Sequence, residues 1–549
     1  MNSSTPTDPV PENGRRPRWL SPRQAFWSVL VTFGLASALW SLANPLMAAV
    51  DEPAHMIKAT ATVRGQLEGE PRGVGVDFFR TPEVFGQVAD YAACFAFRVE
   101  QPASCTLPLA GDLGAPSKEL SSAARYNPLY YAVVGLPSLA PVGEVSVYLM
   151  RVVSGLLTAL GLAFVARTIA EMRERSWLVL GVVVCLTPTV LHLASSINPQ
   201  GVELAGAMGV WVTLLALLRD PDPALVARRT GRLALATVLL ANARGLGPFF
   251  VALVVVACVL AAPWGRTAAV LRDRRARVGL AVCVAGSLAA LAWIRFGGSL
   301  PITEVSHPEY TPREVVKVTL LSTDTYVEGA LGLFGWLDTY LPTWLYVVIG
   351  SLPVLVIVLG LALGRARDRL LMAAIGLGVL LLPIAIHVLQ APRLGWFWQG
   401  RYILPLAFGI PVLAAFAIRQ GVVPLPRALG TRLVAVVGVV LAVAHVFAFA
   451  INMHRYVNGV RGSWSSAHPD AWLPPVHPVV LTVAFAATML VLAEVLRRIA
   501  VEPSDGQVGA DAGPRAEGPA GRPDADAEDA DREPVVARPG ASNPAPGGV

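Results

Sequence analysis

Two acids and a histidine follow directly on the first long apolar run of the chain. Residues 47–56 read MAAVDEPAHM and contain Asp51, Glu52 and His55. Pro53 suits the first turn of a helix, and residues four positions apart lie on one helix face, so Asp51 and His55 could face the same space. A carboxylate there could take a proton from an acceptor hydroxyl as a general base. We therefore predict these three as catalytic residues; the alternative is an acid pair that only caps a helix at a membrane boundary.

Arginine, amide and aromatic side chains near other apolar runs could bind a substrate on the same side. A guanidinium grips phosphate with two N–H groups, in a geometry that lysine lacks, so Arg244 and Arg401 are candidates for the phosphate of a lipid. Arg151 lies inside an apolar run, where an arginine usually meets an acid, a cavity or an anionic ligand. The alternative for the whole set is an interfacial belt of aromatic and arginine side chains. The predicted substrate-binding residues are Tyr126, Asn127, Tyr130, Arg151, Asn198, Glu203, Arg244, Trp336, Asp338, Gln399, Arg401 and Tyr402.

The composition indicates that these residues are carried by membrane-spanning helices. Of 549 residues, 54% are hydrophobic and 15% charged, and the mean hydropathy is +0.55. Such a chain is a polytopic membrane protein, which excludes a cytosolic enzyme, a transcription factor and a secreted mini-protein. The net charge is +6, but residues 501–549 contribute −6, so residues 1–500 carry +12. Basic loops between apolar runs account for this excess without a nucleic-acid partner.

Arginines fall on every second connection between the apolar runs. They cluster in residues 173–175, 219–232, 266–277, 365–369, 419–432 and 497–498. The positive-inside rule then places both termini in the cytoplasm and gives an all-α bundle of about 12 transmembrane helices over residues 25–499. The run 233–262 carries NARGLGP in its middle and is predicted to be a hairpin of two short helices with its tip at Arg244. Residues 47–144 and 297–340 become the large outer loops.

The two ends of the chain differ from this membrane domain. Residues 1–24 form a polar, proline-rich head, and residues 500–549 form a tail rich in Ala, Gly, Pro and Asp. Both are predicted to be disordered and cytoplasmic, because they cannot bury enough apolar surface to offset the entropy of ordering. The run 26–42 is predicted to be a signal anchor, with a cleaved signal peptide as the alternative.

The five cysteines separate into two groups. Cys94 and Cys105 share the first outer loop, an oxidising location, so we predict a disulfide between them; two unpaired thiols are the alternative. The other three lie inside apolar runs and are predicted to be packing residues. The sequence has no Walker A loop, HExxH or GxSxG motif, which argues against ATP hydrolysis and zinc proteolysis.

Several motifs together resemble a known family. They are DEPAHMIKA from Asp51, ACFAF and PASC around Cys94 and Cys105, YNPLYY from Tyr126, FGWLDTYLP from Phe334 and QGRYILPL from Gln399. They resemble the bacterial membrane proteins catalogued as domain of unknown function 2142, which are similar to GT-C glycosyltransferases. The resemblance covers roughly residues 20–500, and Val50 departs from it where proline is common.

This resemblance implies an activity and its partners. It implies a GT-C-like bundle in a bacterial plasma membrane that transfers a sugar from a polyprenyl-phosphate donor to a glycan or lipid-linked acceptor at the outer face. Asp51 matches the catalytic acid of the first outer loop best, and Glu52 is the alternative. Some GT-C enzymes use a divalent metal and others use none, so a metal is possible and no cofactor is certain. A transporter or flippase of lipid-linked sugars and a non-catalytic envelope scaffold are the rival readings.

Overall fold

Nine helices in the described part of the chain are long and apolar enough to cross a membrane. The structure is a computed structural model that describes residues 19–502 apart from 74, 141–142, 300–304, 422, 424 and 466–470. The nine are α1 (Pro22–Leu42), α6 (Glu144–Ala170), α9 (Gln200–Arg219), α13 (Arg277–Phe296), α16 (Thr343–Leu363), α17 (Ala366–Leu394), the segment η3 (Gly400–Ile403), α18 (Leu404–Ala407) and α19 (Gly409–Arg419), then α20 (Arg427–Asn458) and α21 (Pro478–Ala500). The chain is therefore an all-α polytopic membrane protein, as predicted.

Two bent helix pairs raise the number of spans to as many as eleven in the described residues. Helices α7 (Ser176–Val183) and α8 (Pro188–Ala194) meet at 72°, and α11 (Gly247–Leu260) and α12 (Trp264–Arg272) at 117°. The difference from the predicted twelve arises at α10 (Val226–Ala243), whose first two turns carry three arginines. Helices α10 and α11 break at Arg244, where the hairpin tip was predicted.

The predicted head and tail fall mostly outside the described residues. Residues 1–18 and 503–549 are not described. Helix α1 begins at Pro22, shortly before the predicted boundary, and α21 ends at Ala500. The predicted disorder of both ends stays a prediction.

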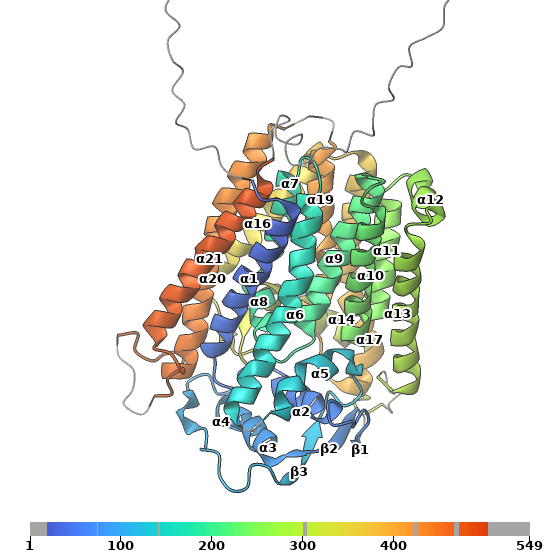
Figure 1. The fold of residues 1–549 in the computed structure, drawn as a ribbon. Helices are drawn as coiled ribbons and strands as arrows, with labels where there is room; N and C mark the ends of the chain where they lie inside the picture. Colours follow the sequence, from blue (N-terminus) through green and yellow to red (C-terminus); the bar gives the residue numbers. More distant parts are fainter. Residues whose placement is uncertain are drawn as a thin grey trace, which may run out of the picture. The chain divides into compact units, whose positions relative to one another are not determined.

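The arginine-rich connections gather at one end of the bundle, the upper end in Figure 1. Arg219 pairs with Asp368 at 2.7 Å, and Arg232 pairs with Glu171 at 2.6 Å. Arg367 donates to the carbonyl of Ala262 at 2.8 Å. These contacts join loops that are far apart in the sequence, as the alternation of arginines requires.

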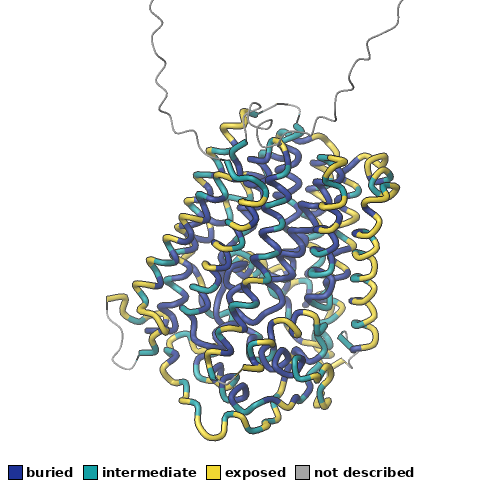
Figure 2. The backbone as a smooth tube through the Cα atoms, in the orientation of Figure 1, coloured by how far each residue is buried: buried dark blue, intermediate teal, exposed yellow. Residues whose placement is uncertain are grey.

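Helix α9 lies at the centre of the bundle. All residues of its apolar segment are buried, whereas only 11% of the α13 segment is (Figure 2). A Cβ added to Gly206 or Gly209 would lie within 2.8 Å of Leu240 or Ala236 on α10, so only glycine permits this approach. The close packing fixes the N-terminal end of α9, which carries Gln200 and Glu203, beside the Arg244 break.

The predicted outer loop 47–144 is a folded unit at the opposite end from the arginine loops (Figure 1). It contains α2 (Glu52–Thr62), α3 (Glu83–Ala89), α4 (Tyr91–Phe95), η1 (Ala103–Cys105), α5 (Pro128–Val134) and η2 (Leu136–Leu139). Its antiparallel sheet has the order β1 (Glu70–Gly73), β2 (Val76–Pro82) and β3 (Pro116–Ser121). The structure joins Cys94 and Cys105 by a disulfide, with Cα atoms 5.5 Å apart.

The second predicted outer loop also contains regular structure. It holds α14 (Pro312–Leu321), α15 (Thr323–Leu331) and a hairpin of β4 (Leu333–Phe334) and β5 (Thr339–Tyr340). The hairpin lies against the segment that precedes α2, because the N–H of Val50 donates to the carbonyl of Gly335 at 3.1 Å. Residues of both outer loops thereby meet at Asp51.

Candidate functional site

Asp51 is held in an unusual backbone conformation at the start of α2. It is the N-cap of α2 with φ 67°, in the left-handed region that residues with a Cβ rarely adopt. Its side chain is 43% exposed, and its Oδ2 lies 3.2 Å from Nη2 of Arg401, whose side chain is 6% exposed. An accessible acid thus faces a buried guanidinium.

Left-handed backbone conformations concentrate around this acid. Of the five described non-glycine residues with positive φ, four lie here: Met47, Asp51, Phe97 and Leu337. The Nε1 of Trp336 donates to the carbonyl of Met47 at 3.0 Å, and its ring centroid lies 5.5 Å from that of Phe97. Such strain persists only where the surroundings enforce it, and it clusters at functional sites.

Two arginines face one tyrosine ring in the site. The Cζ of Arg244 lies 4.3 Å and that of Arg401 5.6 Å from the ring centroid of Tyr402. Glu203 on α9 pairs with Arg244 at 3.8 Å, and the Nε2 of Gln200 donates to the carbonyl of Arg401 at 3.0 Å. The first turn of α9 therefore positions both guanidiniums.

Several buried polar atoms around Arg401 have no hydrogen-bond partner within the described residues. Most buried polar atoms in proteins are paired, so an unpaired group calls for an explanation. A cluster of such atoms fits a site that a polar ligand completes. The atoms are Nε of Arg401, Oε1 of Gln399, Oε1 of Gln200 and Nδ1 of His192. Oε2 of Glu203 likewise has no hydrogen bond, although it forms the ion pair with Arg244.

His55 lies behind Asp51 and is neutral at pH 7. Its Nδ1 is 2.8 Å from the hydroxyl of Tyr131, and its ring contacts that of Tyr126 at 5.5 Å. Burial, opposed by the Asp51 carboxylate and aided by the guanidiniums of Arg244 and Arg401, lowers the pKa of His55 to about 4. His55 therefore adds no charge to the site, and its contacts join α2 to the segment that begins α5.

Glu52, the alternative base, is fully engaged inside the protein. Its Oε2 accepts from Nη2 of Arg151 at 2.7 Å, and its Oε1 accepts from Nε of Arg151 at 2.7 Å and from the N–H of Ile197 at 3.0 Å. The remaining N–H groups of Arg151 donate to the carbonyls of Ser41, Asn44 and Pro45. Both side chains are at most 1% exposed. Arg151 was predicted to bind substrate, but all five of its N–H groups are used within the protein.

Five other predicted binding residues support the fold around the site. Asn127 caps α5 by accepting from the N–H of Leu129 at 3.0 Å, and Asn198 accepts from the N–H of Gln200 at 2.9 Å. The remaining contacts are those of Tyr130 with Ser154 at 2.8 Å, Trp336 with Met47 at 3.0 Å and Asp338 with Arg455 at 3.1 Å. These residues position the segments that carry Asp51 and Arg401.

The structure adds two residues that sequence reasoning missed. Gln200 and His192 contribute buried unpaired atoms beside Arg401, and His192 interacts electrostatically with that arginine. Neither stands in a motif, and the only signal for Gln200 was its place at a helix start. Their burial became visible only in the folded chain.

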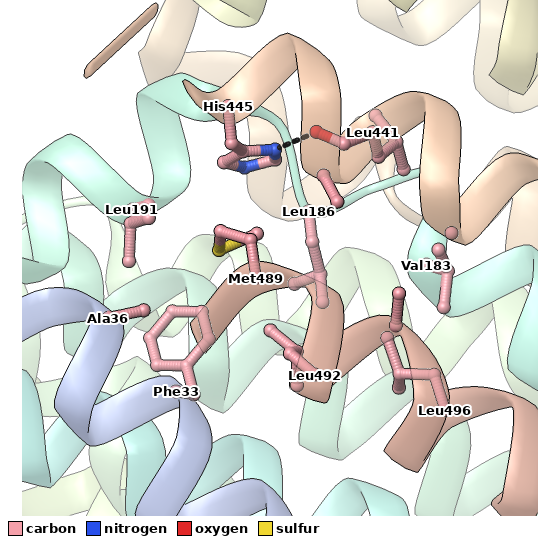
Figure 3. A pocket seen from close by; sticks show the side chains of 13 residues that line it. Phe33, Ala36, Val183, Leu186, Leu191, Leu441, His445, Met489, Leu492 and Leu496 are labelled. Atoms are coloured by element: carbon pink, nitrogen blue, oxygen red, sulfur yellow. Dashed lines mark hydrogen bonds between the residues drawn. The ribbon is translucent and has the colours of Figure 1, made fainter. Parts of the chain in front are cut away.

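Two other kinds of site that could matter beside the residues around Asp51 are a metal site and an apolar cavity. The described residues contain no group of three His, Cys, Asp or Glu side chains that could hold a metal ion. The cavity in Figure 3, about 30 Å³ in volume, is lined by apolar side chains and His445, whose Nδ1 donates to the carbonyl of Leu441 at 2.7 Å. It lies among α1, α7, α8, α20 and α21 and has no charged group.

Comparison with known proteins identifies a family. The family model described as predicted membrane protein (DUF2142) matches residues 33–410, a range that contains Asp51, Glu203, Arg244 and Arg401. No curated protein matches the chain. The match covers more than half of the sequence, so the chain belongs to the DUF2142 family of predicted membrane proteins.

Proposed function

We propose that this protein is an outer-face membrane glycosyltransferase of the GT-C type. It transfers a sugar from a polyprenyl-phosphate donor to a hydroxyl of a cell-envelope glycan. The observation that carries the proposal is the exposed Asp51 carboxylate 3.2 Å from the buried Arg401 guanidinium. An acid and a phosphate-binding cation side by side are what this displacement reaction needs.

Arg401 and Arg244 bind the donor phosphate in this mechanism. Arg401 has an unpaired buried Nε, and both guanidiniums lie at the ring of Tyr402. The phosphate competes with the Asp51 carboxylate for Arg401, so donor binding frees that carboxylate for the acceptor hydroxyl.

The chemical step is a direct displacement at the anomeric carbon. Asp51 takes the proton of the acceptor hydroxyl, and the acceptor oxygen bonds to the anomeric carbon as the bond from that carbon to the phosphate oxygen breaks. The electron pair stays on the departing polyprenyl phosphate, and the guanidiniums stabilise its added negative charge. The configuration at the anomeric carbon is inverted.

An apolar groove could accommodate the long lipid chain of the donor. It has a volume of about 350 Å³ and lies between α11 and α17, with Leu406 of α18 in its lining. Phe249, at one end, follows Arg244 by five residues, and Leu406 follows Arg401 by five. We assign the groove to the prenyl chain, whose phosphate then reaches the two arginines.

Binding of polyprenyl phosphate tests the donor site. Arg401→Ala is expected to weaken binding by about tenfold or more, because a charge-assisted hydrogen bond contributes about 1.5–3 kcal/mol. Native mass spectrometry of the detergent-solubilised protein measures the bound fraction, with Arg401→Lys to separate charge from fork geometry. The exposed Arg295, at the outer end of α13, gives the matched control Arg295→Ala. Equal affinity of wild type and Arg401→Ala would contradict the assignment.

We further propose that the folded unit of the first outer loop faces outward in a bacterial plasma membrane, with both termini cytoplasmic. Arginine loops at the other end support this orientation. In intact cells, a Glu68→Cys variant should react with an impermeant thiol reagent. Arg274→Cys should react only after permeabilisation. Both sites are exposed, and the opposite pattern would reverse the orientation and reject an outer-face site.

A transporter or flippase of lipid-linked sugars is the second candidate. The breaks of 72° and 117° in the two bent helix pairs favour it, because broken helices are common in transporters. The paired charges of the site, however, lie at a bundle end beside an outer loop, which supports chemistry at the surface.

A further inference from the structure

A charged cavity lies at the other end of the bundle from Asp51. It has a volume of about 410 Å³, is open to the outside and is lined by the first turns of α20 and the end of α21. Helix α20 has 32 residues, a length of about 48 Å, and its far end carries Arg455 near the outer unit. The mechanism proposed above does not use this cavity.

Arginines dominate the charge of its lining. Arg427, Arg432 and Arg497 line it against one carboxylate, that of Glu502. Arg427 pairs with Glu174 at 3.0 Å and with Glu502 at 3.1 Å, and Arg497 pairs with Glu494 at 2.6 Å. Arg432 is exposed and makes no ion pair with any of the described residues. The cavity therefore offers positive charge to an anion from outside the chain.

Apart from Thr431, the rest of the lining is small and apolar. Ala428, Ala435 and Ala500 form the apolar wall. Farther along the same two helices, Val436 of α20 is 61% exposed and Val491 of α21 is 53% exposed. An anion that carries apolar chains can thus place its charge on the arginines and its chains on these helices.

We propose that this cavity binds the head group of an anionic phospholipid from the leaflet at this end of the bundle. Guanidiniums bind a phosphodiester with paired N–H groups, and basic pockets between membrane helices select anionic head groups. The bound lipid joins the ends of α20 and α21. This inference does not depend on the proposed enzymatic activity.

Native mass spectrometry with defined lipids tests the proposal. The full-length protein in detergent is titrated with phosphatidylglycerol or with phosphatidylcholine. Wild type should prefer phosphatidylglycerol, and Arg432→Gln should weaken its binding by about tenfold, the effect of losing one charge-assisted hydrogen bond to a phosphate. Arg432→Lys should recover part of the loss, because it keeps the charge.

Arg369→Gln is the matched control, since Arg369 is exposed at the same end of the bundle but does not line the cavity. It should bind phosphatidylglycerol like the wild type. Equal binding by wild type and Arg432→Gln, or equal losses in Arg432→Gln and Arg369→Gln, would overturn the proposal. Competition by inorganic phosphate at the concentration that phosphatidylglycerol requires would also overturn it, because the ligand would then be a soluble anion. Unfolding temperatures without added lipid check that the variants are folded.

Discussion

Replacing Asp51 by asparagine is expected to slow sugar transfer by about 100-fold or more, the usual contribution of a general base. Asparagine keeps the shape of the side chain but cannot take the acceptor proton. It is also among the residues that best tolerate the left-handed conformation of position 51, where φ is 67°. The backbone around α2 should therefore remain unchanged, and the loss should appear in turnover.

Measuring donor binding distinguishes the loss of a catalytic base from a loss of substrate binding. The Asp51 carboxylate lies 3.2 Å from Arg401 and competes with the donor phosphate. Asp51→Asn should thus bind polyprenyl phosphate at least as tightly as the wild type, whereas Arg401→Ala should bind it more weakly. Transfer at the wild-type rate by Asp51→Asn would contradict the role of Asp51 as base.

Replacing Glu52 by glutamine is expected to lower the free energy of unfolding by about 3–5 kcal/mol, because it leaves the Arg151 charge buried without a counter-charge. Both side chains are at most 1% exposed, and two hydrogen bonds of 2.7 Å join them. Thermal unfolding in detergent should show a much lower midpoint for Glu52→Gln. Asp90→Asn changes an exposed acid of the same outer unit and should stay within about 0.5 kcal/mol of the wild type.

A double variant identifies the cause of this loss. Glu52→Gln combined with Arg151→Met removes both charges, so it should lose less stability than the two single variants together. A Glu52→Gln variant that unfolds like the wild type but no longer transfers sugar would make Glu52 the base.

Local sequence signals were sufficient to predict most of the membrane-spanning helices. Arginines on alternate connections and long apolar runs predicted the spans, and NARGLGP predicted the break between α10 and α11. Each signal comes from a few neighbouring residues, so it can be recognised without knowing how the helices pack. Apart from the helix that begins near Pro53, the helices inside the two predicted outer loops were not foreseen, because short helices there depend on contacts with the rest of the unit.

The site depended on contacts that no local pattern contains. Asp51 and Arg401 are 350 positions apart, and Glu52 and Arg151 are 99 apart. The sequence favoured Asp51 and kept Glu52 as the alternative, whereas folding buries Glu52 against Arg151 and leaves Asp51 half-exposed beside Arg401. Burial of Gln200 and His192 likewise follows from the packing of α8 and α9.

One assay distinguishes the proposed glycosyltransferase most directly from a transporter. The purified protein is reconstituted in vesicles with polyprenyl-phosphate sugars labelled in the sugar, and an envelope glycan is supplied as acceptor. The label should move from the lipid to the glycan with release of polyprenyl phosphate in the wild type, and this transfer should be lost in Asp51→Asn. Label that crosses the bilayer still attached to its lipid, at equal rates in both proteins and without release of polyprenyl phosphate, would contradict the proposed enzyme.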